Sequence, residues 1–171
     1  MLRIPLLLMK DKQAFTRKDG ALRLAGKPID IAKKLKGKGV RLIHIVDTDA
    51  LKGLSTNLDV YDNLTYVINV QVECAPKQDI VMKLLSLRCR VVLPPSFDTS
   101  SLKEKRLLVA KIPEDYDGDA EGFHDVVLEN ADSESVKRFS SLGKRVLVFE
   151  PDYHKLDPEA QKVLWGIISS S

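Results

Sequence analysis

Short apolar runs rich in β-branched residues recur along this sequence, and they restrict the folds open to it. Seven runs are candidate strands, at residues 2–9, 41–46, 66–72, 89–93, 106–112, 125–128 and 145–149. Runs that are apolar almost throughout are typical of strands buried on both faces, as in a parallel sheet. The sequence therefore predicts a buried sheet of about seven parallel strands.

The intervals between these runs carry helix signals. Helices are expected over residues 28–38, 79–87, 133–142 and 157–168. The first has Pro28 at its start, and the last begins with Asp157-Pro158, a favourable helix-capping sequence. The intervals 94–105 and 113–123 are poor in helix signals and are expected to be loops or very short helices. Alternating strands and helices predict βα units in one α/β domain over residues 1–171.

Composition bounds the class of protein. Of 171 residues, 44% are hydrophobic and 30% are charged, which is typical of a globular domain. Lys and Arg total 27 against 24 Asp and Glu, and the resulting net charge of +3 is spread along the chain. This pattern argues against a nucleic-acid partner. The length is also short for an eight-stranded α/β barrel, which rarely has fewer than ~200 residues.

The cysteines and the apolar segments predict a cellular setting. Cys74 and Cys89 form neither a CxxC pair nor a metal-ligand spacing, so we expect a reducing compartment, no disulfide framework and no metal. The apolar run at 6–9 ends at Lys10 without a signal-peptide cleavage site, and no stretch approaches the ~20 apolar residues of a membrane span. The sequence thus predicts a cytoplasmic protein without a membrane partner or a cofactor.

Residues 26–53, GKPIDIAKKLKGKGVRLIHIVDTDALKG, resemble the first αβ unit of the barrels of histidine biosynthesis, ProFAR isomerase (HisA) and its cyclase relative (HisF). The matching positions are His44, Val46, Asp47, Asp49 and Gly53, and Leu51 stands where the family has alanine. The similarity covers about the N-terminal half and fades after about Ser96. The resemblance implies a truncated or reduced TIM-like (βα) barrel with some short or missing helices, whose site lies at the carboxyl ends of the strands.

The functional motifs of that family are altered here. Where the family has three glycines and an arginine after its third strand, residues 72–77 read VECAPK. Glu73 places a negative charge where the family binds phosphate, and Pro76 lacks an N–H donor. At the positions of the family's catalytic aspartates, the sequence has Leu8 and Lys111. Because leucine cannot transfer a proton, we do not expect the family reaction by the family mechanism.

Polar residues at the strand ends give a candidate site. Its candidate catalytic residues are Asp47, Lys111 and Lys10, and its candidate ligand-binding residues are Asp49, Lys77, Ser96 and Glu129. One interpretation is a polar pocket in which Asp47 acts with a lysine in proton transfer, or a lysine forms a Schiff base. The other is a set of ion pairs at an inactive barrel end, with Asp47 capping the following turn. His44, among apolar neighbours, is expected to be a satisfied core residue.

Three functions follow as hypotheses. The first is a non-catalytic binding or structural protein related to these barrels. The second is an enzyme of isomerase or Schiff-base lyase type that acts on a small phosphorylated or carbonyl metabolite. The third, which is weaker, is an RNA-associated protein that uses the basic helix face of Lys33, Lys34 and Lys36. Because seven strands leave an edge unpaired, we also expect either a homodimer that covers the edge or a smaller closed barrel.

Overall fold

The computed structural model describes residues 1–170, which group into two compact units. The N-terminal unit comprises residues 4–92 and Ser170, and the C-terminal unit comprises residues 93–169 and 1–3. Elements of the N-terminal unit are β1 (Leu2–Lys10), β2 (Gln13–Lys18), β3 (Ala21–Gly26), α1 (Pro28–Gly37), β4 (Leu42–Asp47), α2 (Thr48–Leu51), α3 (Leu58–Leu64), β5 (Asn69–Glu73), α4 (Gln78–Ser86) and β6 (Arg90–Leu93). Elements of the C-terminal unit are η1 (Lys105–Leu107), β7 (Leu108–Ile112), β8 (Asp125–Leu128), α5 (Ser133–Ser141), β9 (Arg145–Phe149), α6 (Glu150–Tyr153), α7 (Pro158–Lys162) and β10 (Gly166–Ser169).

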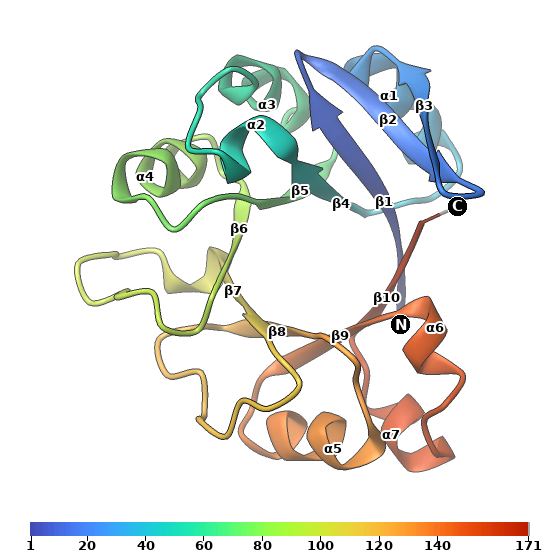
Figure 1. Cartoon of the computed structure of the whole chain (residues 1–171), viewed down its shortest axis with the longest axis vertical. Coiled ribbons are helices and arrows are strands. Elements are labelled where there is room, and N and C mark those ends of the chain that lie inside the picture. Colours follow the sequence, from blue (N-terminus) through green and yellow to red (C-terminus); the bar gives the residue numbers. More distant parts are fainter. Residues whose placement is uncertain (171) are drawn as a thin grey trace. The chain divides into compact units, whose positions relative to one another are not determined.

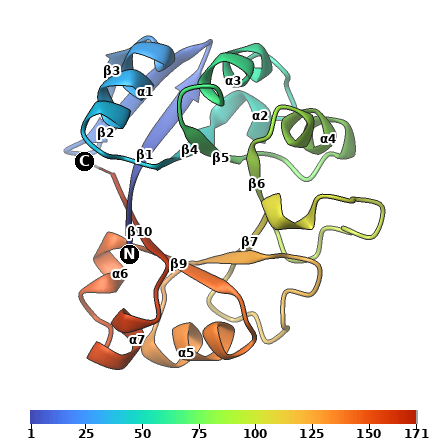
Figure 2. The same cartoon turned by 180° about the vertical axis from the view of Figure 1, so that it is seen from behind.

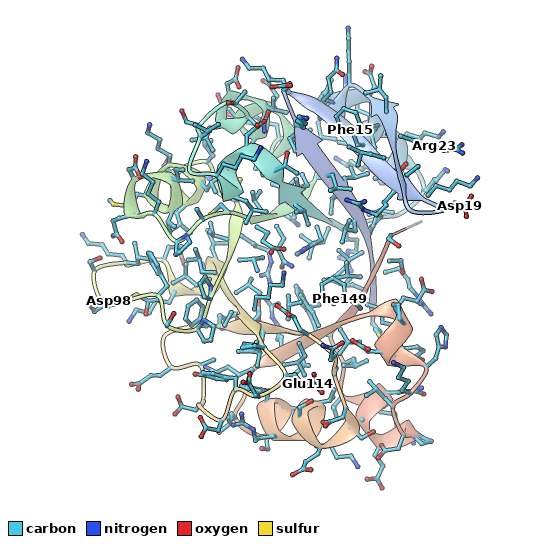
Figure 3. All side chains as sticks on the ribbon, viewed as in Figure 1. Phe15, Asp19, Arg23, Asp98, Glu114 and Phe149 are labelled. Atoms are coloured by element: carbon cyan, nitrogen blue, oxygen red, sulfur yellow. The ribbon has the colours of Figure 1, made fainter. Side chains whose placement is uncertain are left out.

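Four parallel strands form the sheet of the N-terminal unit, in the order β6-β5-β4-β1. An antiparallel hairpin of β2 and β3 extends this sheet from β1. Phe15 and Arg23 come from the two hairpin strands, and Asp19 lies in the turn that joins them (Figure 3). Helices α1, α3 and α4 lie side by side on one face of this sheet, with α3 between the other two (Figures 1 and 2).

The two faces of this sheet differ in what they contact. Successive side chains of a strand point to opposite faces. Ile43, Ile45 and Asp47 share the face toward the helices, because Asp47 bonds to Tyr61 of α3. His44 therefore points to the opposite face.

The C-terminal unit repeats the parallel arrangement with strands in the order β10-β9-β8-β7. Helix α5 packs on β8, β9 and α7, and α6 packs on β9 and β10 (Figure 1). Strand β10 also pairs with the start of β1, where the Leu2 N–H donates to the Trp165 carbonyl at 2.9 Å. Both long edges of β10 are thus occupied.

The predicted fold class is confirmed: the chain has the α/β architecture of a reduced TIM-like (βα) barrel with several very short helices. The sequence predicted about seven parallel strands, and the structure has one more, with four in each unit. The missed strand, β10, lies in residues predicted to be helix up to 168; α7 ends at Lys162 instead. The homodimer stays a prediction.

Two other differences concern the first half of the chain. The strand expected from residue 66 begins at Asn69, because the backbone after α3 makes turns in which Tyr66 and Val67 donate to α3 carbonyls. The β2–β3 hairpin was not predicted. Its first turn contains no glycine, although Asp11 and Lys12 have φ values of 47° and 65°. No helix within residues 1–170 has the length and apolar character to cross a membrane. The cytoplasmic location stays a prediction.

Candidate functional site

Asp47 is the last residue of β4 and the N-cap residue of α2, and its carboxylate is fully buried. Its Oδ1 atom accepts hydrogen bonds from the Ala50 N–H and from the Asn57 side-chain amide, both at 2.8 Å. Its Oδ2 atom accepts a hydrogen bond from the Tyr61 hydroxyl, also at 2.8 Å. Charge-assisted bonds of this kind satisfy a carboxylate that would otherwise be costly to bury. The interpretation of Asp47 as the cap of the following turn is confirmed.

Asp49 and Asn57 extend this network to the β1–β2 turn. The Asp11 N–H donates to Asp49 Oδ2 at 3.0 Å, and the Lys12 N–H donates to Asn57 Oδ1 at 2.6 Å. The Asn57 amide also donates to Asp49 Oδ2 at 3.0 Å. Both turn residues have the left-handed backbone that side chains disfavour, so these bonds offset a local strain. We call Asp47, Asp49, Asn57 and Tyr61 the Asp47 cluster.

Burial controls the protonation of the groups around the Asp47 cluster. It raises the pKa of Tyr61 well above its usual value, and the negative charge of Asp47 raises it further. Burial also raises the pKa of Cys74 to about 12, with added effects from the charges of Asp47 and Glu73. The phenol is thus a stable donor at neutral pH, and the thiol is a poor nucleophile.

A second polar network lies on the opposite face of the same sheet. His44, Gln71 and Arg90 occupy paired positions on β4, β5 and β6. The Gln71 amide nitrogen lies 2.9 Å from His44 Nδ1, and Gln71 Oε1 accepts from Arg90 Nε at 3.0 Å. His44 Nε2 also lies 3.7 Å from Glu73 Oε2. His44 is thus buried in the core, as predicted, but the contact of its Nε2 atom with Glu73 is longer than a hydrogen bond. Its partners Gln71 and Arg90 were missed.

The structure places the predicted site residues of the N-terminal unit apart. Lys10 is exposed at the end of β1. Lys77 is exposed before α4, and its side chain lies near Gly53. A Cβ atom placed on this glycine would lie 3.9 Å from Lys77 Nζ. Within the described part of the chain, neither lysine forms an ion pair or hydrogen bond with Asp47. Asp49, in contrast, lies in the Asp47 cluster.

In the C-terminal unit, the structure joins two of the three predicted residues. Lys111 Nζ lies 3.7 Å from Glu129 Oε1, and both side chains are partly exposed. This pair fits the ion-pair interpretation of the strand ends. Ser96 is exposed in the turn after β6. Asp98 and Glu114 lie in the loops that follow β6 and β7 (Figure 3).

An ion pair between a buried carboxylate and a partly exposed arginine lies at the amino ends of the strands in the same unit. Asp125 begins β8 with its side chain fully buried, and Arg145 begins β9. Arg145 Nε and Nη2 donate to the two Asp125 oxygens at 2.7 and 2.9 Å. The guanidinium also lies 3.8 Å from the ring centre of Trp165. Because this is the end opposite to a barrel's usual site, the cluster supports stability.

No group of three or more His, Cys, Asp or Glu side chains within residues 1–170 has the arrangement of a metal site.

Known proteins resemble part of this chain. No family model matches the sequence. A ProFAR isomerase of Nitrosopumilus maritimus is 32% identical over 93 residues, which are 53% of this chain and 37% of the relative. The ProFAR isomerase of Methanocaldococcus jannaschii is 31% identical over 119 residues, 61% of this chain and 50% of the relative. An uncharacterized protein of the same organism is 25% identical over 122 residues, 63% and 54% of the two chains.

These matches cover half or less of each isomerase. The resemblance inferred from the residues around Asp47 is nevertheless confirmed by them. Over about half of its length, this chain is similar to the ProFAR isomerases.

Proposed function

We propose that this chain is a divergent HisA-like barrel protein that lacks ProFAR isomerase activity and serves as a binding or structural protein. The observation that carries the proposal is the internal use of the Asp47 carboxylate, which accepts three hydrogen bonds from its own unit. A carboxylate in this arrangement stabilises the turn at the start of α2 and joins the end of β4 to α3.

The proton-transfer groups expected for the isomerase reaction do not assemble in the N-terminal unit. Such a reaction needs an acid and a base within hydrogen-bond reach of the substrate. Leu8 occupies the position at the end of the first strand, where it is buried between Val46 and Phe15 on the neighbouring strands. The nearby carboxylates, Asp47 and Asp49, are bonded within the Asp47 cluster.

The backbone after β5 gives a second argument. A phosphate cradle needs N–H groups that point toward the ligand. Here the Ala75 N–H donates to the Ala50 carbonyl at 3.0 Å, and the Lys77 N–H donates to the Ala75 carbonyl at 2.7 Å. Pro76 has no N–H to offer. The segment that resembles the family's phosphate loop is therefore bonded internally.

Turnover of ProFAR by the purified chain tests this proposal. We expect no increase above the uncatalysed rate, while the Methanocaldococcus jannaschii isomerase serves as the positive control. An Asp47→Asn variant is measured in parallel. Any turnover by the unmodified chain would overturn the proposal, and turnover lost in an Asp47→Asn variant that remains folded would assign proton transfer to Asp47.

The Lys111–Glu129 pair favours a second candidate, an enzyme of Schiff-base type acting on a small carbonyl or phosphorylated metabolite. The side chain of Lys111 is 31% exposed, and a carboxylate lies 3.7 Å from its amine. A lysine at such a strand end is accessible to an aldehyde. Borohydride reduction in the presence of glyceraldehyde, followed by peptide mass mapping, tests it. An adduct at Lys111 or Lys10 above the level of other exposed lysines supports this candidate, and uniform labelling removes it.

A further inference from the structure

A hollow of about 390 Å³ lies at the amino ends of β4 and β5, within the N-terminal unit. The end of α1 and the turn after α3 supply most of its lining. The side chains used in the argument below are Lys36, Val40, Arg41, Tyr66, Val67 and Ile68. Its volume is in the range of small-molecule sites. It lies at the other end of the strands from the Asp47 cluster.

The charge of this hollow has one sign. Lys36 and Arg41 both line it, and none of its lining residues is acidic. Among residues 1–170, neither cation forms an ion pair, and both side chains are exposed. Two unpaired cations among the lining residues of one hollow are within reach of an anion bound there, and a guanidinium matches phosphate oxygens in geometry.

The same hollow presents an aromatic ring to solvent. Tyr66 is 86% exposed, and its hydroxyl has no hydrogen-bond partner within the described residues. Apolar side chains of Val40, Val67 and Ile68 line the hollow beside it. An exposed ring next to apolar and cationic groups is a platform on which a planar base can stack.

The position of the two basic residues also has a purely structural explanation. Helices α1 and α3 end at this hollow, and basic groups there complement the negative end of a helix dipole. However, turn N–H groups already bond carbonyls of both helices: Val40 N–H donates to Leu35 at 3.1 Å, and Val67 N–H donates to Leu64 at 2.9 Å. The helix ends therefore do not need the lysine or the arginine as hydrogen-bond partners.

We propose that this hollow binds a nucleoside monophosphate, with the phosphate between Lys36 and Arg41 and the base on the Tyr66 ring. The site is independent of the proposed function, because it uses no residue at the carboxyl ends of the strands. Inorganic phosphate would contact only the two cations, and an uncharged nucleoside would contact only the Tyr66 ring.

Nuclear magnetic resonance titration of the full chain with adenosine monophosphate tests the proposal. We expect shifts of the amides of Val40, Arg41, Val67 and Asn69, which line the hollow. Inorganic phosphate and adenosine, measured separately, should each bind at least about tenfold more weakly. A short single-stranded RNA provides a fourth arm that separates a free nucleotide from a polymer.

Charge reversal supplies the matched variants. Lys36→Glu and Tyr66→Ala should each weaken the binding of adenosine monophosphate by about tenfold. Lys33→Glu, an exposed change on the same helix outside the hollow, should leave it within about twofold. The amide spectrum of each variant shows whether it remains folded.

Three results would overturn the proposal. One is the absence of shifts at the hollow with adenosine monophosphate at about 10 mM. Another is equal weakening by Lys33→Glu and Lys36→Glu, which would show diffuse attraction. The third is tight binding of RNA alone that depends equally on Lys33, Lys34 and Lys36, which would indicate an extended RNA surface.

Discussion

The hydroxyl of Tyr61 lies 2.8 Å from Asp47 Oδ2, and this bond ties helix α3 to the end of strand β4. Both side chains are completely buried. A buried carboxylate that loses a donor retains its desolvation cost, so the partners of Asp47 are decisive for this part of the fold.

We expect Tyr61→Phe to lower the free energy of unfolding by about 1–3 kcal/mol, because it removes one donor from a buried charge. Denaturant unfolding followed by circular dichroism measures the change. Tyr66→Phe is the matched control, and as a surface change it should stay within about 0.5 kcal/mol. Equal denaturation midpoints for Tyr61→Phe and the unmodified chain would contradict the role assigned to this bond.

Asn57→Ala should loosen the β1–β2 turn. The change removes the acceptor of the Lys12 N–H and the amide that joins Asp47 to Asp49. Amide exchange at Asp11 and Lys12 should accelerate, and stability should fall by about 2 kcal/mol. Asn63→Ala, an exposed change on α3, is the control. Unchanged amide exchange at both turn residues would show that the conformation of the turn does not depend on Asn57.

Arg145→Met should be strongly destabilising. It removes the bidentate partner of the buried Asp125 carboxylate, a loss of about 2 kcal/mol because the arginine itself is partly exposed to solvent. Arg106→Met provides the comparison, because its ion pair with Glu104 is exposed and should contribute less than about 1 kcal/mol. Tryptophan fluorescence follows both transitions, since Arg145 stacks on Trp165. Similar losses of stability in the two variants would show that the Arg145–Asp125 pair contributes no more than an exposed ion pair.

Stability should fall as the pH rises above about 9. Burial raises the pKa of both Cys74 and Cys89 from 9.0 to about 12. Between these values the folded chain binds more protons than the unfolded chain, so a rise in pH favours unfolding, by up to about 1.4 kcal/mol per pH unit for each thiol. The raised pKa of Tyr61 acts in the same direction at higher pH.

Denaturant unfolding at a series of pH values from neutral to alkaline measures this effect. Cys89→Ala removes one titrating thiol and should make the decline shallower. An identical decline in this variant and in the unmodified chain would contradict the assignment to the thiols.

The sequence predicted the αβ unit around Asp47 well, because its strand is continuous and its helix starts at a proline. Strand β4 spans Leu42–Asp47, within one residue of the expected run, and α1 begins at Pro28 as expected. Hydrophobic periodicity identifies such elements because burial determines them. It also identified Asp47 and Asp49 as strand-end residues, although their hydrogen-bond partners depend on the tertiary structure.

The missed features depend on pairing between distant segments. The β1–β2 turn has Asp11 and Lys12 where glycine or asparagine is usual, and its support comes from Asp49 and Asn57 far along the chain. Strand β10 has four residues and directly follows a helix signal. Gln71 and Arg90 interrupt apolar runs at positions that are recognised as paired only once the strand register is known.

The bond from the Leu2 N–H to the Trp165 carbonyl has a consequence for how the chain matures. It joins segments about 160 residues apart in the sequence, and such long-range closures are late and slow events in folding. Until β10 has formed, the start of β1 lacks this pairing, which is therefore among the last contacts to be completed.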